Sequence, residues 1–178
     1  IAQTKWKVDA SHSKLGFAVT HMMVAETEGK FKVFDGTASS KTEMDFTDAK
    51  IDFTADASSI NTEDEKRDGH LKSPDFFDVE KNPNLTFVIK KFTKVNDKVY
   101  KVTGDLTLHG VTKAVTLNAK FGGIIKDPYG LTRAGLTVTG EIDRYAFGLK
   151  YNAALEAGGL ALGQKVRIKV NLEFTQAK

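Results

Sequence analysis

The sequence contains no cysteine, only three prolines and no long apolar run. Without cysteine the chain forms no disulfide, has no thiol nucleophile and offers no sulfur ligand to a metal. No apolar run approaches the roughly 20 residues of a membrane-spanning helix. The net charge is only +3, and the lysines are spread along the chain rather than gathered in one block. Charge therefore gives no argument for a nucleic-acid partner.

Size and composition indicate one ordinary globular domain. The chain has 178 residues, of which 40% are apolar and 28% are charged. This length favours a single domain over residues 1–178 and is enough to bury a substantial core. The chain starts with Ile1 rather than methionine. A removed signal peptide would explain this start, as would an arbitrary boundary, and we expect a periplasmic or secreted protein.

Strict alternation of apolar and polar residues is the dominant pattern. Residues 48–58 show it with little ambiguity, because every second residue is apolar and the residues between are charged or hydroxylic. Such a period of two predicts β-strands with one buried face. The predicted strands cover residues 4–8, 13–21, 28–40 with a bend at Asp35-Gly36, 48–58, 85–89, 100–108, 115–121, 134–142 and 166–174.

These eight or nine strands each have one apolar and one charged face. A parallel sheet covered on both faces would need continuous apolar runs, which the strands lack. One antiparallel sheet closed into a barrel satisfies the pattern, with apolar residues inside. A two-sheet sandwich has the same alternation and stays as the alternative, although strands of this length favour a tilted barrel. A barrel of about eight strands holds either one small ligand or a packed core.

A short helix is predicted to interrupt the strands at residues 62–71. Thr62 and Glu65 have the spacing of a capping box, in which each side chain bonds a free backbone amide of the first turn. Gly69 ends or loosens the helix, and Pro74 prevents its continuation. The helix is either a surface crossover or an element that gates the mouth of the barrel.

Histidine and serine spacing gives no conventional catalytic or metal site. The histidines are His12, His21, His70 and His109, and none has a neighbour at metal-ligand spacing. Asp9, Ser11 and His12 are the residue types of a catalytic triad, but members of a triad converge from separate elements. We therefore expect no catalytic residues, no metal ligands and no enzymatic activity.

Polar residues in the irregular segments are the remaining candidates for a site. Arg67, Asp68 and His70 belong to the helix, and Arg144 precedes an Ala- and Gly-rich segment at 145–163 that we expect to form a loop with a helical turn. These residues either make structural ion pairs or form a polar collar that binds the head group of a ligand. The sequence does not distinguish these two interpretations.

Several motifs occur in one order along the chain. They are W-x-V-D-x-x-H-S (6–13), F-A-V-T-H-M (17–22), S-I-N-T (59–62), R-D-G-H-L-K-S-P-D-F-F-D (67–78), L-T-F (85–87), G-D-L-T-L-H-G-V-T-K (104–113) and D-R-Y-A-F-G-L (143–149). On these residues the chain resembles the YceI-like family of bacterial polyisoprenoid-binding, lipocalin-like proteins. The chain departs from the family pattern at Asn82 and Ala114, both near strand starts.

The resemblance implies an all-β fold, an antiparallel eight-stranded lipocalin-like barrel with one short helix against it. It also implies a hollow interior that binds a long isoprenoid, such as a polyprenyl quinone tail, with no other cofactor. The protein would act as a carrier or storage protein, and the resemblance implies periplasmic export and homodimers, as found for many members. A carrier of this kind is also expected to make transient membrane contact. Two alternatives remain, a lipid-modifying enzyme that uses the same cavity and a stress-response protein with a solid core.

Ligand-binding residues are predicted from the inward faces of the strands and from the polar collar. They are Phe17, Val19, Phe53, Arg67, His70, Phe76, Phe87, Leu108, Leu117, Leu136, Arg144, Phe147 and Ile168.

Overall fold

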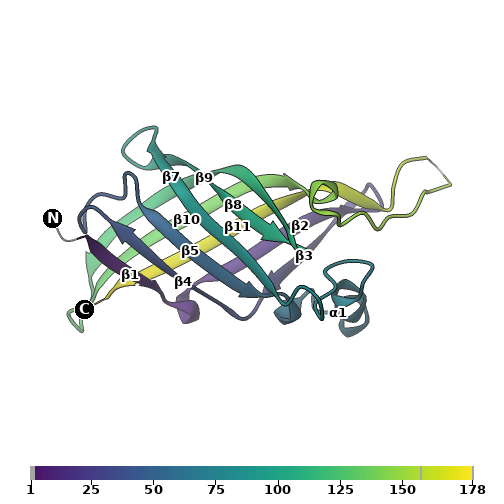
Figure 1. Ribbon diagram of the computed structural model, residues 1–178, viewed down its shortest axis with the longest axis horizontal. Helices are drawn as coiled ribbons and strands as arrows, with labels where there is room; N and C mark the ends of the chain where they lie inside the picture. Colours follow the sequence, from purple (N-terminus) through teal and green to yellow (C-terminus); the bar gives the residue numbers. More distant parts are fainter. Residues whose placement is uncertain (1–2, 157, 178) are drawn as a thin grey trace.

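Antiparallel strands account for most of the computed structural model, which describes residues 3–156 and 158–177 (Figure 1). The strands are β1 (Thr4–Val8), β2 (Lys14–His21), β3 (Ala25–Phe31), β4 (Phe34–Ser40), β5 (Lys50–Asp56), β6 (Ile60–Asn61), β7 (Asn84–Lys94), β8 (Val99–Leu108), β9 (Val111–Lys126), β10 (Thr132–Asp143) and β11 (Leu162–Gln176). One α-helix, α1 (Glu65–Lys72), and three 3-10 turns, η1 (Ala10–His12), η2 (Ala57–Ser59) and η3 (Arg144–Phe147), complete the described elements.

The sheet closes on itself because β1 has two partners. One edge of β1 pairs with β4, and its other edge pairs with the last residues of β11. The ring β1-β4-β5-β7-β8-β9-β10-β11 is therefore a closed eight-stranded antiparallel barrel, while β2, β3 and β6 are additional strands at one end. The predicted barrel is confirmed, and the sandwich alternative is wrong.

The three additional strands are continuations of ring strands across local bends. η1 separates β1 from β2, and η2 separates β5 from β6. The side chain of Asp9 accepts a hydrogen bond from the backbone amide of Ser11, and Asp56 does the same for Ser58. Aspartate before a turn commonly makes this bond, which competes with regular pairing. The alternating pattern therefore continues through the bends although the strands do not.

The predicted bend at residues 35–36 is wrong. The chain bends at residues 32–33, between β3 and β4, and Val33 is 58% exposed rather than inward. At this point the Val33 carbonyl accepts from the amide of Asp56, and the Val33 amide donates to the Ser59 hydroxyl. The bend thus matches the position of η2 in the neighbouring strand, a long-range effect that local composition does not show.

An aromatic core fills the end of the barrel that contains the chain termini (Figure 1). Phe46, from the loop after β4, is fully buried, and its ring centroid lies 5.4 Å from that of Trp6 and 6.3 Å from that of Phe174. The Trp6 indole N–H donates to the Ser40 hydroxyl at 2.9 Å, which satisfies a buried donor. Trp6, Phe46 and Phe174 therefore pack against one another and do not line the cavity described below.

Helix α1 starts later and ends later than the sequence predicts. Its cap is Asp64, whose carboxylate accepts from the amide of Arg67, so the predicted capping role of Thr62 is wrong. The Thr62 hydroxyl instead donates to the Asp68 carboxylate at 2.6 Å. Gly69 lies within the helix, which continues to residue 72. None of the helices in residues 3–156 and 158–177 is both long enough and apolar enough to cross a membrane.

The end of the barrel opposite the termini holds α1 and a projecting loop (Figure 1). The loop follows η3 and leads into β11, as predicted for this Ala- and Gly-rich segment. A second set of buried apolar residues, distinct from the aromatic core, occupies the barrel at this end. The functional cavity lies between the two sets.

Candidate functional site

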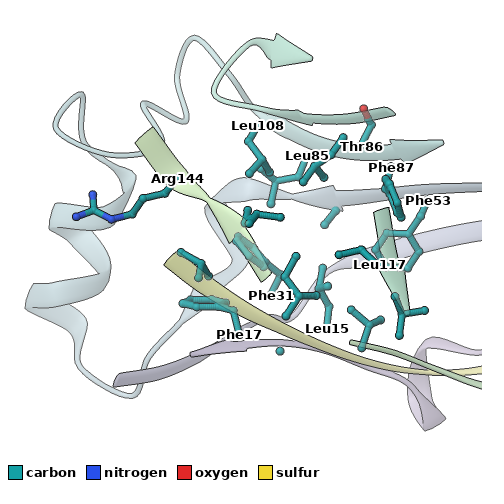
Figure 2. Close-up of a pocket in the computed structure, with 18 of the residues that line it drawn as sticks. Leu15, Phe17, Phe31, Phe53, Leu85, Thr86, Phe87, Leu108, Leu117 and Arg144 are labelled. Atoms are coloured by element: carbon teal, nitrogen blue, oxygen red, sulfur yellow. The ribbon is translucent and has the colours of Figure 1, made fainter. Parts of the chain in front are cut away.

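An apolar cavity of about 190 Å³ connects the two halves of the interior (Figure 2). Strands β2, β3, β5 and β7 to β11 contribute inward side chains, and α1 and the two irregular segments contribute the rest. The wall is formed by Leu15, Gly16, Phe17, Val19, Phe31, Ile51, Phe53, Ala55, Leu71, Phe76, Phe77, Leu85, Thr86, Phe87, Ile89, Leu106, Leu108, Leu117, Val138, Ile142, Arg144, Leu149, Leu162, Val166, Ile168, Val170 and Leu172.

The cavity wall consists almost entirely of hydrocarbon. Within the described part of the chain, the lining contains no carboxylate, histidine, serine or tyrosine, and Thr86 and Arg144 are its polar residues. Figure 2 shows the Arg144 guanidinium turned away from the other lining side chains. A wall of this kind excludes water and favours an apolar chain, and it offers few hydrogen-bonding groups to orient one.

Most of the predicted ligand-binding residues lie at this wall. They are Phe17, Val19, Phe53, Phe76, Phe87, Leu108, Leu117, Arg144 and Ile168. Ligand contact by these side chains stays a prediction. Leu136 and Phe147 do not line the cavity, which corrects that expectation. Both are buried, at 3% and 2% exposed, but Leu136 packs in the aromatic core, and Phe147, the last residue of η3, packs in the second set of apolar residues.

Arg144 is a structural clamp rather than a collar residue. It is 4% exposed, and its guanidinium donates to the backbone carbonyls of Gly163, Leu149, Tyr151 and Leu162 at 2.7, 2.7, 2.9 and 3.3 Å. Burial lowers the pKa of this guanidinium, because loss of contact with water disfavours its charged form, and the nearby Tyr145 and Asp143 only partly offset this effect. Arg144 therefore fixes the loop before β11 to the barrel.

Arg67 and His70 also make structural contacts and do not line the cavity. Arg67 donates from Nε to the Thr62 hydroxyl at 2.7 Å and from Nη2 to the Thr62 carbonyl at 2.6 Å, which ties α1 to β6. His70 lies 2.9 Å from the Asp75 carboxylate and packs edge-on against Phe76 and Tyr151. Of the two interpretations left open by the sequence, these contacts favour the structural one.

Four wall residues from the irregular segments were not predicted. Leu71 and Phe77 come from α1 and the chain after it, and Leu149 and Leu162 flank the loop that Arg144 holds. Their signal in the sequence is weak, because a lone apolar residue outside a periodic segment does not indicate direction. Together with Phe76 they place the irregular segments at the cavity's end.

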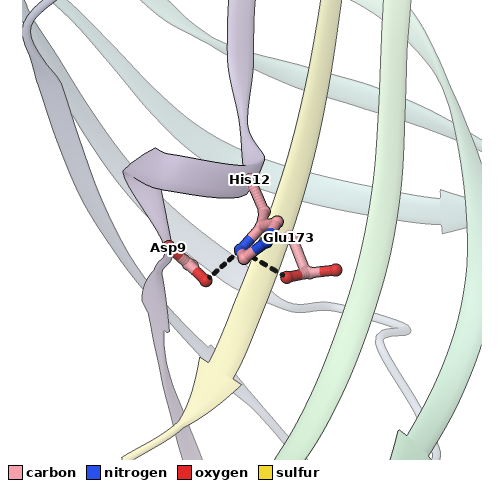
Figure 3. A group of neighbouring side chains, drawn as sticks. All are labelled: Asp9, His12 and Glu173. Atoms are coloured by element: carbon pink, nitrogen blue, oxygen red, sulfur yellow. Dashed lines mark hydrogen bonds and ion pairs between the residues drawn. The ribbon is translucent and has the colours of Figure 1, made fainter.

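A cluster of charged residues lies outside the barrel, around η1 (Figure 3). His12 Nδ1 is 2.8 Å from Asp9 and 3.5 Å from Glu173, and Arg133 Nη1 donates to the same two carboxylate oxygens at 3.0 and 2.9 Å. The Ser11 hydroxyl also approaches His12 at Nδ1, so the Nε2 contact that a triad requires is not made. The guanidinium of Arg133 already provides the positive charge beside these two carboxylates. The cluster ties β1, β10 and β11 together.

This cluster makes stability depend on pH. Hydrogen bonds from Ser11, His12 and Arg133 hold the pKa of Asp9 far below its ordinary 3.8, so its stabilisation is present above that value and is lost in acid. The hydrogen bond to Asp9 raises the pKa of His12 above 6.5, so its contribution is present below 6.5 and is lost as the pH rises through the raised value. The cluster is most stabilising between these limits.

Replacement of Asp9 by asparagine should lower the free energy of unfolding by about 1.5–3 kcal/mol at pH 6, because charged hydrogen bonds are lost. The difference from the wild type should shrink as the pH falls from about 5 to 3, because the Asp9 carboxylate of the unfolded chain then takes up a proton while the folded one, with its lowered pKa, stays ionised. Urea denaturation of both proteins across this pH range measures the difference in their free energy of unfolding. Asp97→Asn is the control, since this side chain is 99% exposed, and a change under about 0.5 kcal/mol is expected. A constant difference at all pH values would contradict the assignment.

Comparison with known proteins gives concordant matches. A sequence model of the YceI-like domain matches residues 6–174. A UPF0312 protein of Staphylococcus aureus (strain USA300) is 39% identical over 173 residues, which cover 97% of this chain and 98% of that protein. The solved YceI protein of Campylobacter jejuni is similar with 28% identity and a TM-score of 0.75, over 89% of this chain and 90% of that one.

A polyisoprenoid binding domain from Saccharophagus degradans, described as implicated in plant cell wall breakdown, also has a similar structure. Its TM-score is 0.70, and the match covers 97% of this chain and 98% of that domain. The two sequences are only 18% identical, so the likeness concerns the fold.

Proposed function

This chain belongs to the YceI-like family, and from that premise we propose that it binds the hydrocarbon chain of an isoprenoid lipid inside the barrel. The observation that carries the proposal is a continuous apolar cavity whose wall comes from strands β2, β3, β5 and β7 to β11. The structural likeness to a domain named for polyisoprenoid binding supports the same ligand class. The tail, rather than the head, is what this cavity recognises.

Apolar burial supplies the driving force, and ordering of the chain limits it. Each buried methylene contributes about 0.8 kcal/mol, so several isoprene units would together exceed the practical limit of about −20 kcal/mol for any ligand. Ordering of the tail, and loss of its contacts in a membrane, offset much of this gain. Affinity therefore depends weakly on the head group, and we propose a polyprenyl quinone as one member of a wider ligand class.

A long chain requires the wall to move. The cavity of about 190 Å³ is smaller than the roughly 300–1,000 Å³ of sites for drug-sized ligands. Phe17, Phe53 and Phe87 line it and are only half-buried, so rotation of their rings would lengthen the open space. We propose that these phenylalanines adjust to the ligand while the aromatic core stays packed.

The role that follows is a carrier or storage protein without catalysis. A lipid-modifying enzyme would need an activated nucleophile or an acid at the wall, and the described lining offers only the Thr86 hydroxyl, with no histidine or carboxylate among the wall residues to activate it. Mass spectrometry of organic extracts from natively purified protein tests the proposal. A retained isoprenoid supports it, a chemically altered lipid favours the enzyme, and repeated absence of lipid after loading with a long-chain polyprenyl quinone would overturn it.

Filling the cavity should reduce binding without unfolding the protein. Ile168 in β11 is half-buried and lines the cavity, so the larger ring of Ile168→Trp has open space to enter. We expect the bound polyprenyl quinone per mole of protein to fall about tenfold, with the melting temperature unchanged or higher. Lys169→Trp is the matched control, because this neighbour is exposed and points outward. Equal quinone content in the two variants would contradict the placement of the ligand.

A further inference from the structure

Exposed apolar side chains gather at the end of the barrel where the projecting loop lies. Met22, Met23 and Val24 form the turn between β2 and β3 and are 45%, 60% and 88% exposed, and Leu160 of the projecting loop is 45% exposed. We call Met22–Val24 and residues 158–161 the tip. Large apolar groups on a projection have no partner within the protein, which indicates a partner outside it.

The two parts of the tip form one structural unit. The amide of Met22 donates to the carbonyl of Ala161 at 2.8 Å, and His21 pairs with Leu162. The sulfur of Met23 lies against Gly159, where a side chain on that residue would collide with it. The apolar side chains are therefore held together rather than scattered.

The backbone of the turn is unfavourable for the residues it carries. Met22 and Met23 have φ of 50° and 64°, and Val24 closes the turn by donating its amide to the His21 carbonyl. A β-turn whose two central residues both have positive φ strongly prefers Asn-Gly at these positions, because long side chains are strained in the left-handed region. Two methionines here reduce stability, so their apolar side chains have a use other than forming the turn.

The tip is continuous with the cavity wall. Val19 and Leu162 line the cavity a few residues from the tip, on the strands that lead into it. Tyr151, 45% exposed on the projecting loop, places its ring 5.0 Å from that of the wall residue Phe76. A molecule that contacted the tip would thus lie beside the end of the cavity that the irregular segments cover.

From this arrangement we infer that the tip inserts into the surface of a lipid bilayer and places the cavity's end against the membrane, where an isoprenoid chain is dissolved. The inference rests on the proposed lipid binding. Methionine is flexible and tyrosine is amphipathic, and both suit the boundary between head groups and acyl chains. The loop carries one positive residue, Lys150, and one negative residue, Glu156, whose charges cancel. Insertion therefore depends on apolar contact and needs no anionic lipid.

The variant Met22→Asn/Met23→Gly separates insertion from folding and from cavity loading. It removes the apolar side chains and installs the dipeptide that the turn prefers, so the melting temperature should be unchanged or higher. Met44→Asn is the matched control, because Met44 is 72% exposed in the loop that carries Phe46 of the aromatic core. Neither variant changes the cavity wall.

Three measurements use the full chain. Flotation with phosphatidylcholine vesicles should retain the wild type and the control, with little change on adding salt, and should lose the double variant. Extraction of a long-chain polyprenyl quinone from these vesicles should be about tenfold slower or more for the double variant. Loading of the same quinone from detergent should be equal in all three proteins.

The outcomes distinguish the two proposals. Failure of all three proteins to load quinone from detergent would overturn the proposed function, whatever the flotation result. Normal loading with no flotation of the wild type, or with equal extraction by the double variant, would overturn membrane insertion. A wild-type dimer that dissociates in the double variant, seen by analytical ultracentrifugation with extraction unchanged, would assign the tip to contact between two copies and would also overturn it.

Discussion

Leu117→Asp should leave no stably folded barrel. Leu117 in β9 is 4% exposed, lines the cavity and packs against Gly140, whose missing side chain leaves room for it. Deletion of a buried leucine side chain costs about 2–5 kcal/mol, and an unpaired carboxylate in an apolar wall adds several more. The sum approaches the whole stability of a typical domain, about 5–15 kcal/mol. Circular dichroism and urea denaturation should show an unfolded or molten chain.

Two controls separate the buried charge from the position in the strand. Leu117→Met keeps the volume and should cost less than about 1.5 kcal/mol. Thr116→Asp places the same charge on the exposed face of the same strand, beside Thr103, and should change stability by about 0.5 kcal/mol at most. A Leu117→Asp variant that melted with the wild type and retained lipid would show that residue 117 does not face the interior.

Alternation was sufficient to predict antiparallel strands with one buried face, because its physical cause acts on every strand. The face that carries Ile51 and Ala55 is buried in β5, and Asp52 and Thr54 between them are exposed, as the period of two requires. Closure did not follow from alternation alone, because a two-sheet sandwich covers an apolar face equally well, and only the length of the strands favoured the barrel. Whether the interior was hollow did not follow from periodicity, because cavity-wall and packed residues are equally apolar.

The features that the sequence did not reveal depend on contacts between distant segments. Phe46 lies in a loop, so no periodicity marks it, yet it is the centre of the aromatic core. Thr62 has the spacing of a helix cap, but Asp64 takes that role because the Thr62 hydroxyl bonds Asp68. Arg144 is an ordinary surface residue type, and only the fold brings its four carbonyl partners around it. In irregular segments, the local sequence pattern thus does not indicate which way a side chain points.

The clamp at Arg144 gives the second large effect. Arg144→Met keeps much of the side-chain volume and removes every donor, so the carbonyls of Leu149 and Gly163 lose their partner inside the protein. Each buried carbonyl left without a donor costs about 1–3 kcal/mol, although water will reach part of the loop. We expect a loss of about 3–5 kcal/mol in the free energy of unfolding, measured by urea denaturation, and faster amide exchange at residues 149–162. Arg144→Lys should be intermediate, because one ammonium group cannot reach all four carbonyls.

Ligand selectivity then tests whether Arg144 has any role beyond this clamp. The guanidinium points away from the cavity and is occupied by backbone carbonyls, so it has little to offer a quinone oxygen (Figure 2). In the fraction of Arg144→Met that stays folded, retention of a polyprenyl quinone and of a head-less polyprene of equal length should fall by the same factor. A quinone-specific loss of tenfold or more, the size of one charged hydrogen bond, would instead assign head-group recognition to Arg144. Equal loss would mean that the cavity orients its ligand by the tail alone, with the head left at the membrane side.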